Sequence, residues 1–257
     1  MAFNNFYGTI LVAGCGGTGT QVLKILLQKN YSKITLIDKD TVSISNLNRQ
    51  FFYTKNDVGK YKSEALANKI NNPKIDYLVG DIENLVGRYN LIFCCLDNVS
   101  GRMALNLIDF DVLIDCGVEN NLCHVKKVIK NQNACLYCIK DLYTIDSYVA
   151  PCSAKNIDDL SKRGDILRYL IERYDDVDAL QKFNELCTSK KFKSTDMLEI
   201  DSIRNSIISN VCYINSICAS MAFILLDNEE DFCYIYFNGF EFTKLKIERD
   251  PNCIVCN

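Results

Sequence analysis

The chain of 257 residues contains no tryptophan and a single histidine, His124. One imidazole gives little support to histidine-based catalysis, and residues 123–128 around it predict an ordinary strand. No uninterrupted apolar run approaches the length that crosses a bilayer, and no basic region followed by an apolar stretch begins the chain. These absences argue against a membrane-spanning segment and a signal peptide, and they favour a cytoplasmic location.

Basic residues are not in excess either: the chain has 29 Lys and Arg and 32 Asp and Glu. A net charge of −3 disfavours general binding to nucleic acid or to an anionic membrane. Cysteine, by contrast, is abundant, with 14 residues. Most of these cysteines are scattered through apolar stretches, which predicts small core residues in a reducing compartment rather than a disulfide framework.

A glycine-rich loop follows the first apolar run of the chain. Residues 7–13 predict a buried strand, residues 14–19 form the loop, and residues 22–27 predict a helix. The next predicted strand, residues 33–37, ends at Asp38, where an acid usually binds ribose hydroxyls. In this order, glycines let the backbone approach a phosphate, and N–H groups at the helix start attract the anion. The loop residues that we expect at the nucleotide are Gly14, Gly16, Gly17 and Gly19.

A polar run follows Asp38, and a dehydrogenase has no evident use for it. A triphosphate does, because cations neutralise its charge and amides donate hydrogen bonds to its oxygens. The alternative is a solvated charged loop. The residues of this run that we expect at the phosphates are Asp40, Asn46, Arg49, Gln50 and Lys62.

Asp97 and Asn98 follow another predicted buried strand, residues 91–96, and we expect both at the nucleotide. In open α/β sheets, ligands bind at the carboxyl ends of strands, so Asp97 is placed to hold Mg²⁺ beside the phosphates. The alternative is that Asp97 caps the helix that begins near Val99.

Four cysteines form two pairs with the spacing that suits two thiolates on one tetrahedral zinc ion. Two such pairs close a four-sulfur site, which leaves no open position for chemistry and predicts a structural Zn²⁺. A redox CxxC or unrelated surface thiols are the alternatives. The pairs are Cys135 with Cys138 and Cys253 with Cys256.

The glycine loop, the polar run and the Asp–Asn pair together resemble the ThiF/MoeB/HesA and ubiquitin-activating enzyme superfamily, over most of the chain. The resemblance implies a Rossmann-like, doubly wound, mostly parallel α/β sheet that binds MgATP. It implies adenylation of a small ubiquitin-like or sulfur-carrier protein at its C-terminal glycine, with Arg49, Lys62 and Asp97 as catalytic residues. It also implies a homodimer, formed through the apolar helix of residues 207–226, and a downstream conjugating enzyme.

The resemblance further implies a cysteine nucleophile in the crossover that follows the first cysteine pair. Cys152, within residues 148–154, is the candidate that would receive the acyl group as a thioester. Cys187 is the rival because it lies in a polar, basic stretch. A non-catalytic loop thiol is the alternative, since some relatives only adenylate.

Two features depart from the compact bacterial pattern. Residues 156–201 predict a small helical insert, so we divide the chain into an adenylation core (1–151), a crossover with insert (152–202) and the remainder of the core (203–257). Met1 to Phe6 contain no arginine of the kind that reaches a neighbouring subunit's ATP in many relatives, and Arg102 is the substitute that we consider.

Two other functions fit the same residues. The chain could adenylate a peptide or a small-molecule carboxylate without a covalent enzyme intermediate. It could also be a pseudoenzyme that keeps the fold for partner binding, although the intact nucleotide motif argues against this.

Overall fold

The computed structural model describes residues 7–119, 121–143, 157–160, 163–190, 192–197, 200 and 212–256. The chain divides into two compact units. The first comprises Met1–Val42, Asn46–Tyr143 and Asn210–Asn257, and the second comprises Ser43–Ser45 and Thr144–Ser209. The domain borders predicted after residues 151 and 202 fall outside the described residues, so they stay predictions.

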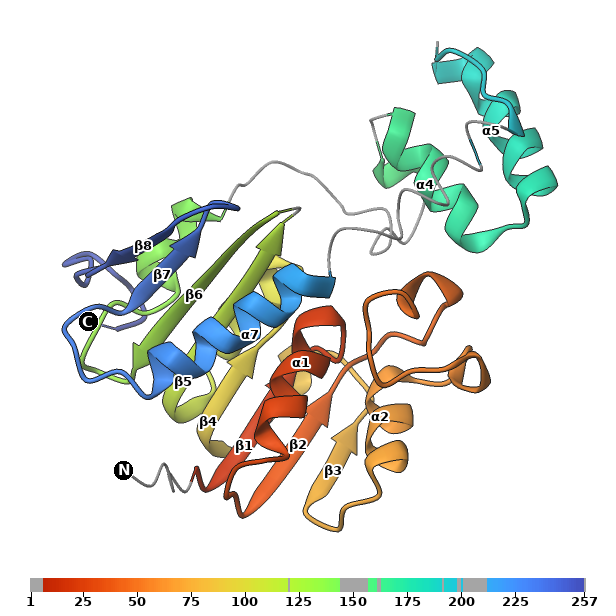
Figure 1. The fold of residues 1–257 in the computed structure, drawn as a ribbon. Coiled ribbons are helices and arrows are strands. Elements are labelled where there is room, and N and C mark those ends of the chain that lie inside the picture. The colour runs from red at the N-terminus through yellow and green to blue at the C-terminus, as the bar shows by residue number, and fades with distance from the viewer. Residues whose placement is uncertain are drawn as a thin grey trace. The chain divides into compact units, whose positions relative to one another are not determined.

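The first unit is built on an eight-stranded sheet in the order β3-β2-β1-β4-β5-β6-β7-β8 (Figure 1). Neighbouring strands from β3 to β5 run parallel, and those from β5 to β8 run antiparallel. This arrangement confirms the predicted Rossmann-like, mostly parallel fold. The strands are β1 (Thr9–Ala13), β2 (Lys33–Ile37), β3 (Ile75–Leu78), β4 (Arg88–Cys94), β5 (Asp109–Glu119), β6 (Leu122–Ile129), β7 (Tyr234–Phe237) and β8 (Phe242–Leu245).

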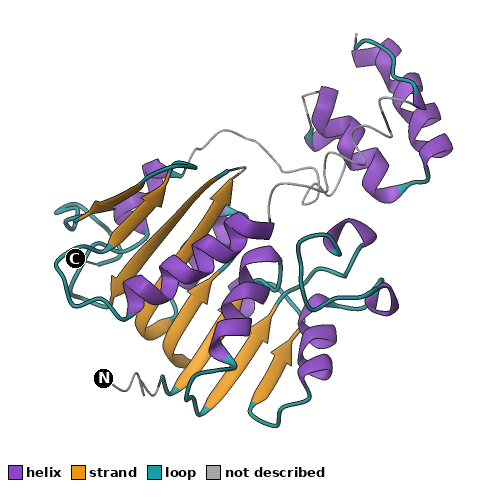
Figure 2. Cartoon of the chain, viewed as in Figure 1, coloured by secondary structure: helices purple, strands orange, loops and turns teal. Residues whose placement is uncertain are grey.

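Helices lie on both faces of this sheet (Figure 2). The strands place alternate side chains on opposite faces, as their period of two requires. Ile10 and Val12 pack into the core beneath α1, α2 and α7, whereas Leu11 and Ala13 pack into a second core with Leu105 of α3. The helices are α1 (Gly17–Leu26), α2 (Lys62–Ile70), α3 (Val99–Leu105) and α7 (Cys212–Leu226).

The sheet aligns the ends of three strands that precede the predicted site. Ala13 of β1 pairs with Ile37 of β2 on one side and with Cys94 of β4 on the other. The glycine loop, Asp38 and Asp97 therefore all leave the sheet at the same carboxyl edge. A ligand at this edge would meet groups from three strands.

The second unit contains α4 (Arg163–Arg173) and α5 (Asp176–Lys190), as the helical pattern of the insert predicts. Leu170 and Phe183 are buried in its small core. Val177, by contrast, is 67% exposed. Val177 lies in the first turn of α5, one residue beyond its acidic start at Asp176.

Candidate active site and metal centre

The glycine loop is held tightly against the sheet. Gly14 has a φ of +92°, and a Cβ there would lie 2.5 Å from the backbone oxygen of Cys95. A Cβ at Gly19 would lie 1.9 Å from the oxygen of Gly14, so the first turn of α1 packs directly on the loop. Side chains at these two positions would displace the backbone. The loop thus keeps the close approach that a phosphate-binding turn needs.

Asp38 closes the loop from the end of β2. Its two carboxylate oxygens accept hydrogen bonds from the backbone N–H groups of Cys15 (2.7 Å) and Asp40 (2.8 Å). Burial raises the pKa of the Asp38 carboxyl above its ordinary value, while Lys62 and these N–H donors counteract part of the rise. A carboxylate can accept about four hydrogen bonds, so Asp38 keeps capacity for the ribose hydroxyls that we predicted.

Lys62 lies at the start of α2 and faces the same carboxylates. Its ammonium is 2.9 Å from Asp40, and its side chain is mostly buried. Burial would lower the pKa of Lys62, but the negative charges of Asp38, Asp40 and Asp97 raise it above its ordinary value. The structure therefore brings four of the predicted residues to one place and keeps the lysine charged.

Asn46, Arg49 and Gln50 lie on one turn, because the backbone oxygen of Asn46 accepts from the N–H groups of both Arg49 (3.2 Å) and Gln50 (2.9 Å). Gln50 is only 3% exposed, and its Oε1 has no hydrogen-bond partner among the described residues. Its Nε2 lies 3.8 Å from the position of a Cβ at Gly16, which has no closer neighbour. The structure thus places the amide of Gln50 against the glycine loop. Arg49 itself is half-buried, and its Nη1 donates to Oδ1 of Asn48 (3.2 Å).

Asn98, rather than Asp97, caps α3. Oδ1 of Asn98 accepts from the backbone N–H of Gly101 (2.7 Å) and from the hydroxyl of Ser100 (3.0 Å). The alternative role of Asp97 as the helix cap is therefore wrong. Asp97 is exposed, and its negative charge contributes to the raised pKa of Lys62. Its role as the Mg²⁺ ligand stays a prediction. A nucleotide contact for Asn98 stays a prediction.

The sequence reasoning did not single out two further residues that support the site. The hydroxyl of Tyr53 lies 2.9 Å from the backbone oxygen of Cys15 and 3.0 Å from that of Lys62, so it ties the glycine loop to α2. The hydroxyl of Thr18 donates to Oδ1 of Asn215 on α7 (2.9 Å). An asparagine in the otherwise apolar stretch of α7 was a signal that could have identified this contact.

Arg102 does not fit the role of a charge offered to a neighbouring subunit. It is 7% exposed, and its guanidinium forms an ion pair with the fully buried Asp115. The Nη2 group also donates to the backbone oxygens of Leu96 and Cys116. This hypothesis is therefore wrong. His124 lies in β6, as predicted, and its Nε2 lies 3.2 Å from Asp115.

The structure describes only one of the two candidate nucleophiles, Cys187. Cys152 lies outside the described residues, so its role stays a prediction. Cys187 is 7% exposed, and its thiol donates to the backbone oxygen of Lys193 (3.5 Å) within the helical unit. The polar sequence around Cys187 suggested an accessible thiol, whereas α5 turns this side chain into the core. Its burial does not suit a nucleophile that must meet a protein substrate.

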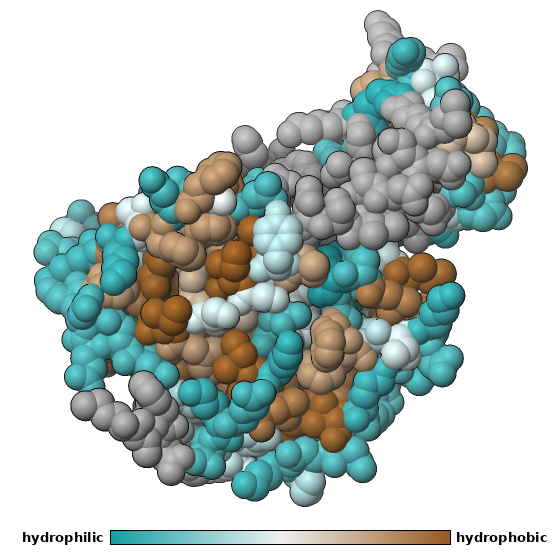
Figure 3. Space-filling view, viewed as in Figure 1, coloured by the Kyte–Doolittle hydropathy of each residue, from teal (hydrophilic) through white to brown (hydrophobic). Residues whose placement is uncertain are grey.

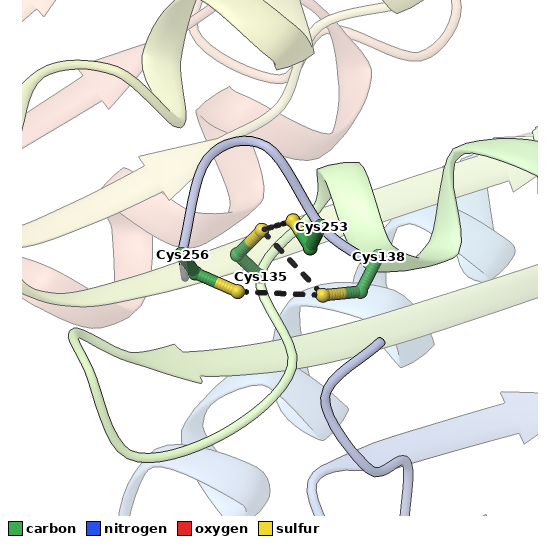
Figure 4. A group of neighbouring side chains, drawn as sticks. All are labelled: Cys135, Cys138, Cys253 and Cys256. Atoms are coloured by element: carbon green, nitrogen blue, oxygen red, sulfur yellow. Dashed lines mark hydrogen bonds between the residues drawn. The ribbon is translucent and has the colours of Figure 1, made fainter. Parts of the chain in front are cut away.

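The four cysteines of the predicted metal site lie together (Figure 4). Their sulfur atoms are all within 4.8 Å of one another. The contacts measure 3.8 Å for Cys135 and Cys138, 3.6 Å for Cys135 and Cys253, and 3.5 Å for Cys138 and Cys256. A tetrahedral zinc ion with Zn–S bonds of ~2.3 Å separates its sulfur ligands by about 3.8 Å. The donor set and its spacing therefore fit a structural metal ion.

The electrostatics of the cluster agree with this fit. Although burial alone would raise it, backbone N–H groups of Val255 and Cys256 lower the pKa of the Cys253 thiol to about 7. Burial raises the pKa of Cys138 to about 12. Four thiolates this close repel one another, so a cation is needed for all four to ionise.

No helix in the described part of the chain is long and apolar enough to span a membrane.

Three curated relatives show different degrees of coverage. The NEDD8-activating enzyme E1 catalytic subunit of Saccharomyces cerevisiae is 28% identical over 290 residues, which cover 96% of this chain and 97% of the yeast protein. The enzyme of the same name from Drosophila melanogaster is 27% identical over 171 residues, covering 57% of this chain and 38% of the fly protein. SUMO-activating enzyme subunit 2 of Dictyostelium discoideum is 31% identical over 142 residues, covering 50% of this chain and 22% of that protein. The matched parts thus span less than half the length of the latter two relatives.

Solved structures share the fold. Escherichia coli MccB with MccA-N7isoASN has a TM-score of 0.60 and 18% identity, covering 97% of this chain and 67% of that chain. MccB with ATP has a TM-score of 0.59 and 17% identity, covering 97% of this chain and 66% of that chain. A model of the ThiF family matches residues 6–254. Because this match takes in nearly the whole sequence, the protein belongs to the ThiF family.

Proposed function

We propose that the protein uses ATP to adenylate the C-terminal carboxylate of a small ubiquitin-like or sulfur-carrier protein, and that Cys152 then accepts the acyl group. The observation that carries the proposal is the convergence at one sheet edge of the glycine loop, Asp38, Gln50 and Lys62. Few other ligands need a phosphate-binding loop, a ribose acid and a buried cation together. Membership of the ThiF family supports the same chemistry.

Each residue has a distinct task in this reaction. The partner's carboxylate attacks the α-phosphorus, the bond to the β-phosphate breaks, and pyrophosphate leaves with its electron pair. Arg49 and Lys62 stabilise the charge that develops on the phosphate oxygens, and Asn46 and Gln50 donate hydrogen bonds to them. Asp97 would hold Mg²⁺, which supplies positive charge beside the phosphates. Holding the carboxylate and the α-phosphate in line accounts for most of the catalysis.

The choice of a protein substrate is supported by the yeast relative, whose similarity extends over almost the full length of both chains. The fold shared with MccB, which was solved with N-formylated MccA, favours a second candidate, namely a peptide or a small-molecule carboxylate. That substrate would need no cysteine nucleophile. A pseudoenzyme is disfavoured by the intact set of nucleotide residues.

We also propose that α7 forms a homodimer contact. Ile224 is exposed on this helix, and Phe242 of β8 lies beside it across a shallow apolar groove that also includes Ile217. Figure 3 shows apolar side chains gathered on this face of the molecule. An exposed apolar surface of this kind is typical of a subunit interface.

ATP–pyrophosphate exchange is expected to distinguish the three functions. A carrier protein that ends in Gly-Gly should stimulate exchange in the presence of Mg²⁺. Labelled pyrophosphate enters ATP only when the adenylated carboxylate forms and is then attacked by pyrophosphate in the reverse reaction. Stimulation by a peptide or small carboxylate alone would favour the second candidate. Binding of ATP without exchange, whatever the partner, would favour the pseudoenzyme.

We propose that the four-cysteine cluster binds one structural Zn²⁺, which fixes the C-terminal tail to the segment after β6. Protein purified without chelators is expected to contain about one zinc per chain by elemental analysis. Cys253→Ser should lose the metal and loosen the tail, which limited proteolysis would detect. Cys212→Ser is the control, since this exposed thiol lies at the start of α7 and outside the cluster. Metal-free protein with an intact tail would contradict the assignment.

A further inference from the structure

A carboxylate with no assigned role lies deep in the core. Asp115 of β5 is fully buried, and three side chains contact it: the guanidinium of Arg102, Nε2 of His124 (3.2 Å) and the hydroxyl of Tyr143 (2.8 Å). Although burial opposes it, the charge of Arg102 lowers the pKa of Asp115, so this carboxyl is ionised. A buried ion pair of this kind is weak evidence for stability, because apolar side chains of similar volume often stabilise a core as well. Its presence therefore calls for a reason other than stability.

Arg102 connects this carboxylate to the nucleotide site. Its Nη1 donates to Asp115, while its Nη2 donates to the backbone oxygens of Leu96 and Cys116. Leu96 directly precedes Asp97, the residue that we assign to Mg²⁺. On the other side of Asp97, Asn98 is fixed as the cap of α3. The backbone on both sides of Asp97 is thus held by polar contacts, one of which depends on the planar fork of an arginine.

Tyr143 connects the same carboxylate to the chain that follows. It is the last described residue before positions 144–156, which include Cys152. Its ring lies beside Arg102, whose guanidinium carbon is 5.5 Å from the ring centre. Burial and the charge of Asp115 raise the pKa of Tyr143, so its hydroxyl stays protonated and donates to Asp115.

We propose that Arg102 and Asp115 are positioning residues for Asp97, and that the hydroxyl of Tyr143 holds Asp115 in place for this task. The contacts form one continuous series, from Tyr143 through Asp115 and Arg102 to the Leu96 carbonyl. The inference rests on the proposed function for the role of Asp97. It goes beyond that function by assigning a task to three buried side chains that touch neither nucleotide nor partner.

The test is the Mg²⁺ dependence of ATP binding, measured by titration calorimetry on the full chain at several free Mg²⁺ concentrations. Tyr143→Phe keeps the ring and removes only the hydroxyl. The half-saturating Mg²⁺ concentration is expected to rise about five-fold, the scale of one lost hydrogen bond. Arg102→Lys keeps the charge but loses the fork, and it should raise this concentration by about ten-fold or more. ATP binding without Mg²⁺ should stay close to that of the unaltered protein in both variants.

If Tyr143 and Arg102 act through one series of contacts, the effects of the two substitutions on the Mg²⁺ requirement should not add. The double variant should require about as much Mg²⁺ as Arg102→Lys alone, because Tyr143 acts through Arg102. Tyr31→Phe is the matched control, since this buried tyrosine accepts from Nδ2 of Asn72 (3.3 Å) and lies outside the network. It should leave the Mg²⁺ requirement unchanged.

Two results would overturn the inference. One is a Tyr143→Phe protein with a lower Tm but the Mg²⁺ requirement of Tyr31→Phe, which would give the network a structural role alone. The other is full additivity in the double variant. ATP binding needs no partner, so these measurements test the network independently of the carrier protein. A failure of every carrier protein to stimulate pyrophosphate exchange would count against the proposed function and not against this inference.

Discussion

Replacing Arg49 by alanine is expected to lower the rate of ATP–pyrophosphate exchange by roughly 10²–10³-fold, the scale of one lost preorganised donor. Arg49 lies on the turn that also carries Asn46 and Gln50, whose amide contacts the glycine loop. Negative charge builds up on the phosphate oxygens as pyrophosphate leaves. A fixed guanidinium therefore contributes more in the transition state than in the ground state.

The same change should have little effect on folding. Arg49 is half-buried, and the backbone contacts of its turn do not depend on its side chain. Arg88→Ala is the matched control. Arg88 starts β4 at the amino end of the sheet, is 61% exposed, and pairs with Asp109 and Asp111. Its loss should leave exchange within about two-fold, because exposed ion pairs contribute little.

The measurement separates binding from chemistry. If Arg49 acts mainly in the transition state, the maximal exchange rate should fall while the affinity for MgATP changes less. Near-normal exchange in Arg49→Ala would remove this residue from the catalytic set. A fall of the same size in Arg88→Ala would show that the assay reports folding instead.

The fold and the meeting of the glycine loop, Asp38 and Asp97 at one edge of the sheet could be predicted because they depend on local pattern. Apolar runs that end in glycine, Asp38 or Asp97 specify buried parallel strands and the edge at which they meet, whatever the rest of the chain does. Lys62 could be placed near these acidic residues by the same reasoning. Its ion pair with Asp40 joins the end of β2 to the start of α2, only one connection apart in the chain.

Contacts between distant segments could not be predicted in this way. Thr18 and Asn215 are 197 positions apart, and only the packing of α1 against α7 brings them together. Arg102 illustrates the same limit. Its sequence neighbourhood leaves open whether it faces solvent or the core, and the answer depends on Asp115, which β5 places on the same face of the sheet. His124 reaches Asp115 because β5 and β6 pair, which the sequence around either residue does not specify.

Adjacent polar residues are a further case. Asp97 and Asn98 both suit a helix cap and a metal site, and composition does not assign the roles. The structure identifies the helix cap through one hydrogen bond, from the N–H of Gly101 to Asn98. The buried position of Cys187 likewise follows from the side of α5 that packs against the helical core, rather than from the charges beside it in sequence.

Cys152→Ala is expected to abolish any thiol-reducible bond to the partner while ATP–pyrophosphate exchange continues. The two steps use different groups. Adenylation needs the nucleotide residues on the carboxyl edge of the sheet, whereas transfer of the acyl group needs a thiolate that attacks the acyl carbon and displaces AMP. The readout is a partner adduct on a non-reducing gel that disappears with a reducing agent.

Two other cysteines provide matched controls for this experiment. Cys212, at the start of α7, is exposed, so Cys212→Ala tests whether any accessible thiol can capture the partner. Cys187→Ala tests the buried rival, which would have to leave the core of the helical unit before it could react. Both variants should form the adduct at nearly the rate of the unaltered protein, because neither thiol combines exposure with a place in the crossover.

The outcomes assign the chemistry whichever way they fall. An adduct that persists in Cys152→Ala and vanishes in Cys187→Ala would place the nucleophile in the helical unit, and α5 would then have to open during the reaction. An adduct that vanishes only in Cys212→Ala would place it at the start of α7. If the unaltered protein adenylates a carrier and never forms an adduct, the enzyme stops at the acyl-adenylate. The acyl-adenylate, a mixed anhydride, would then be the product passed on.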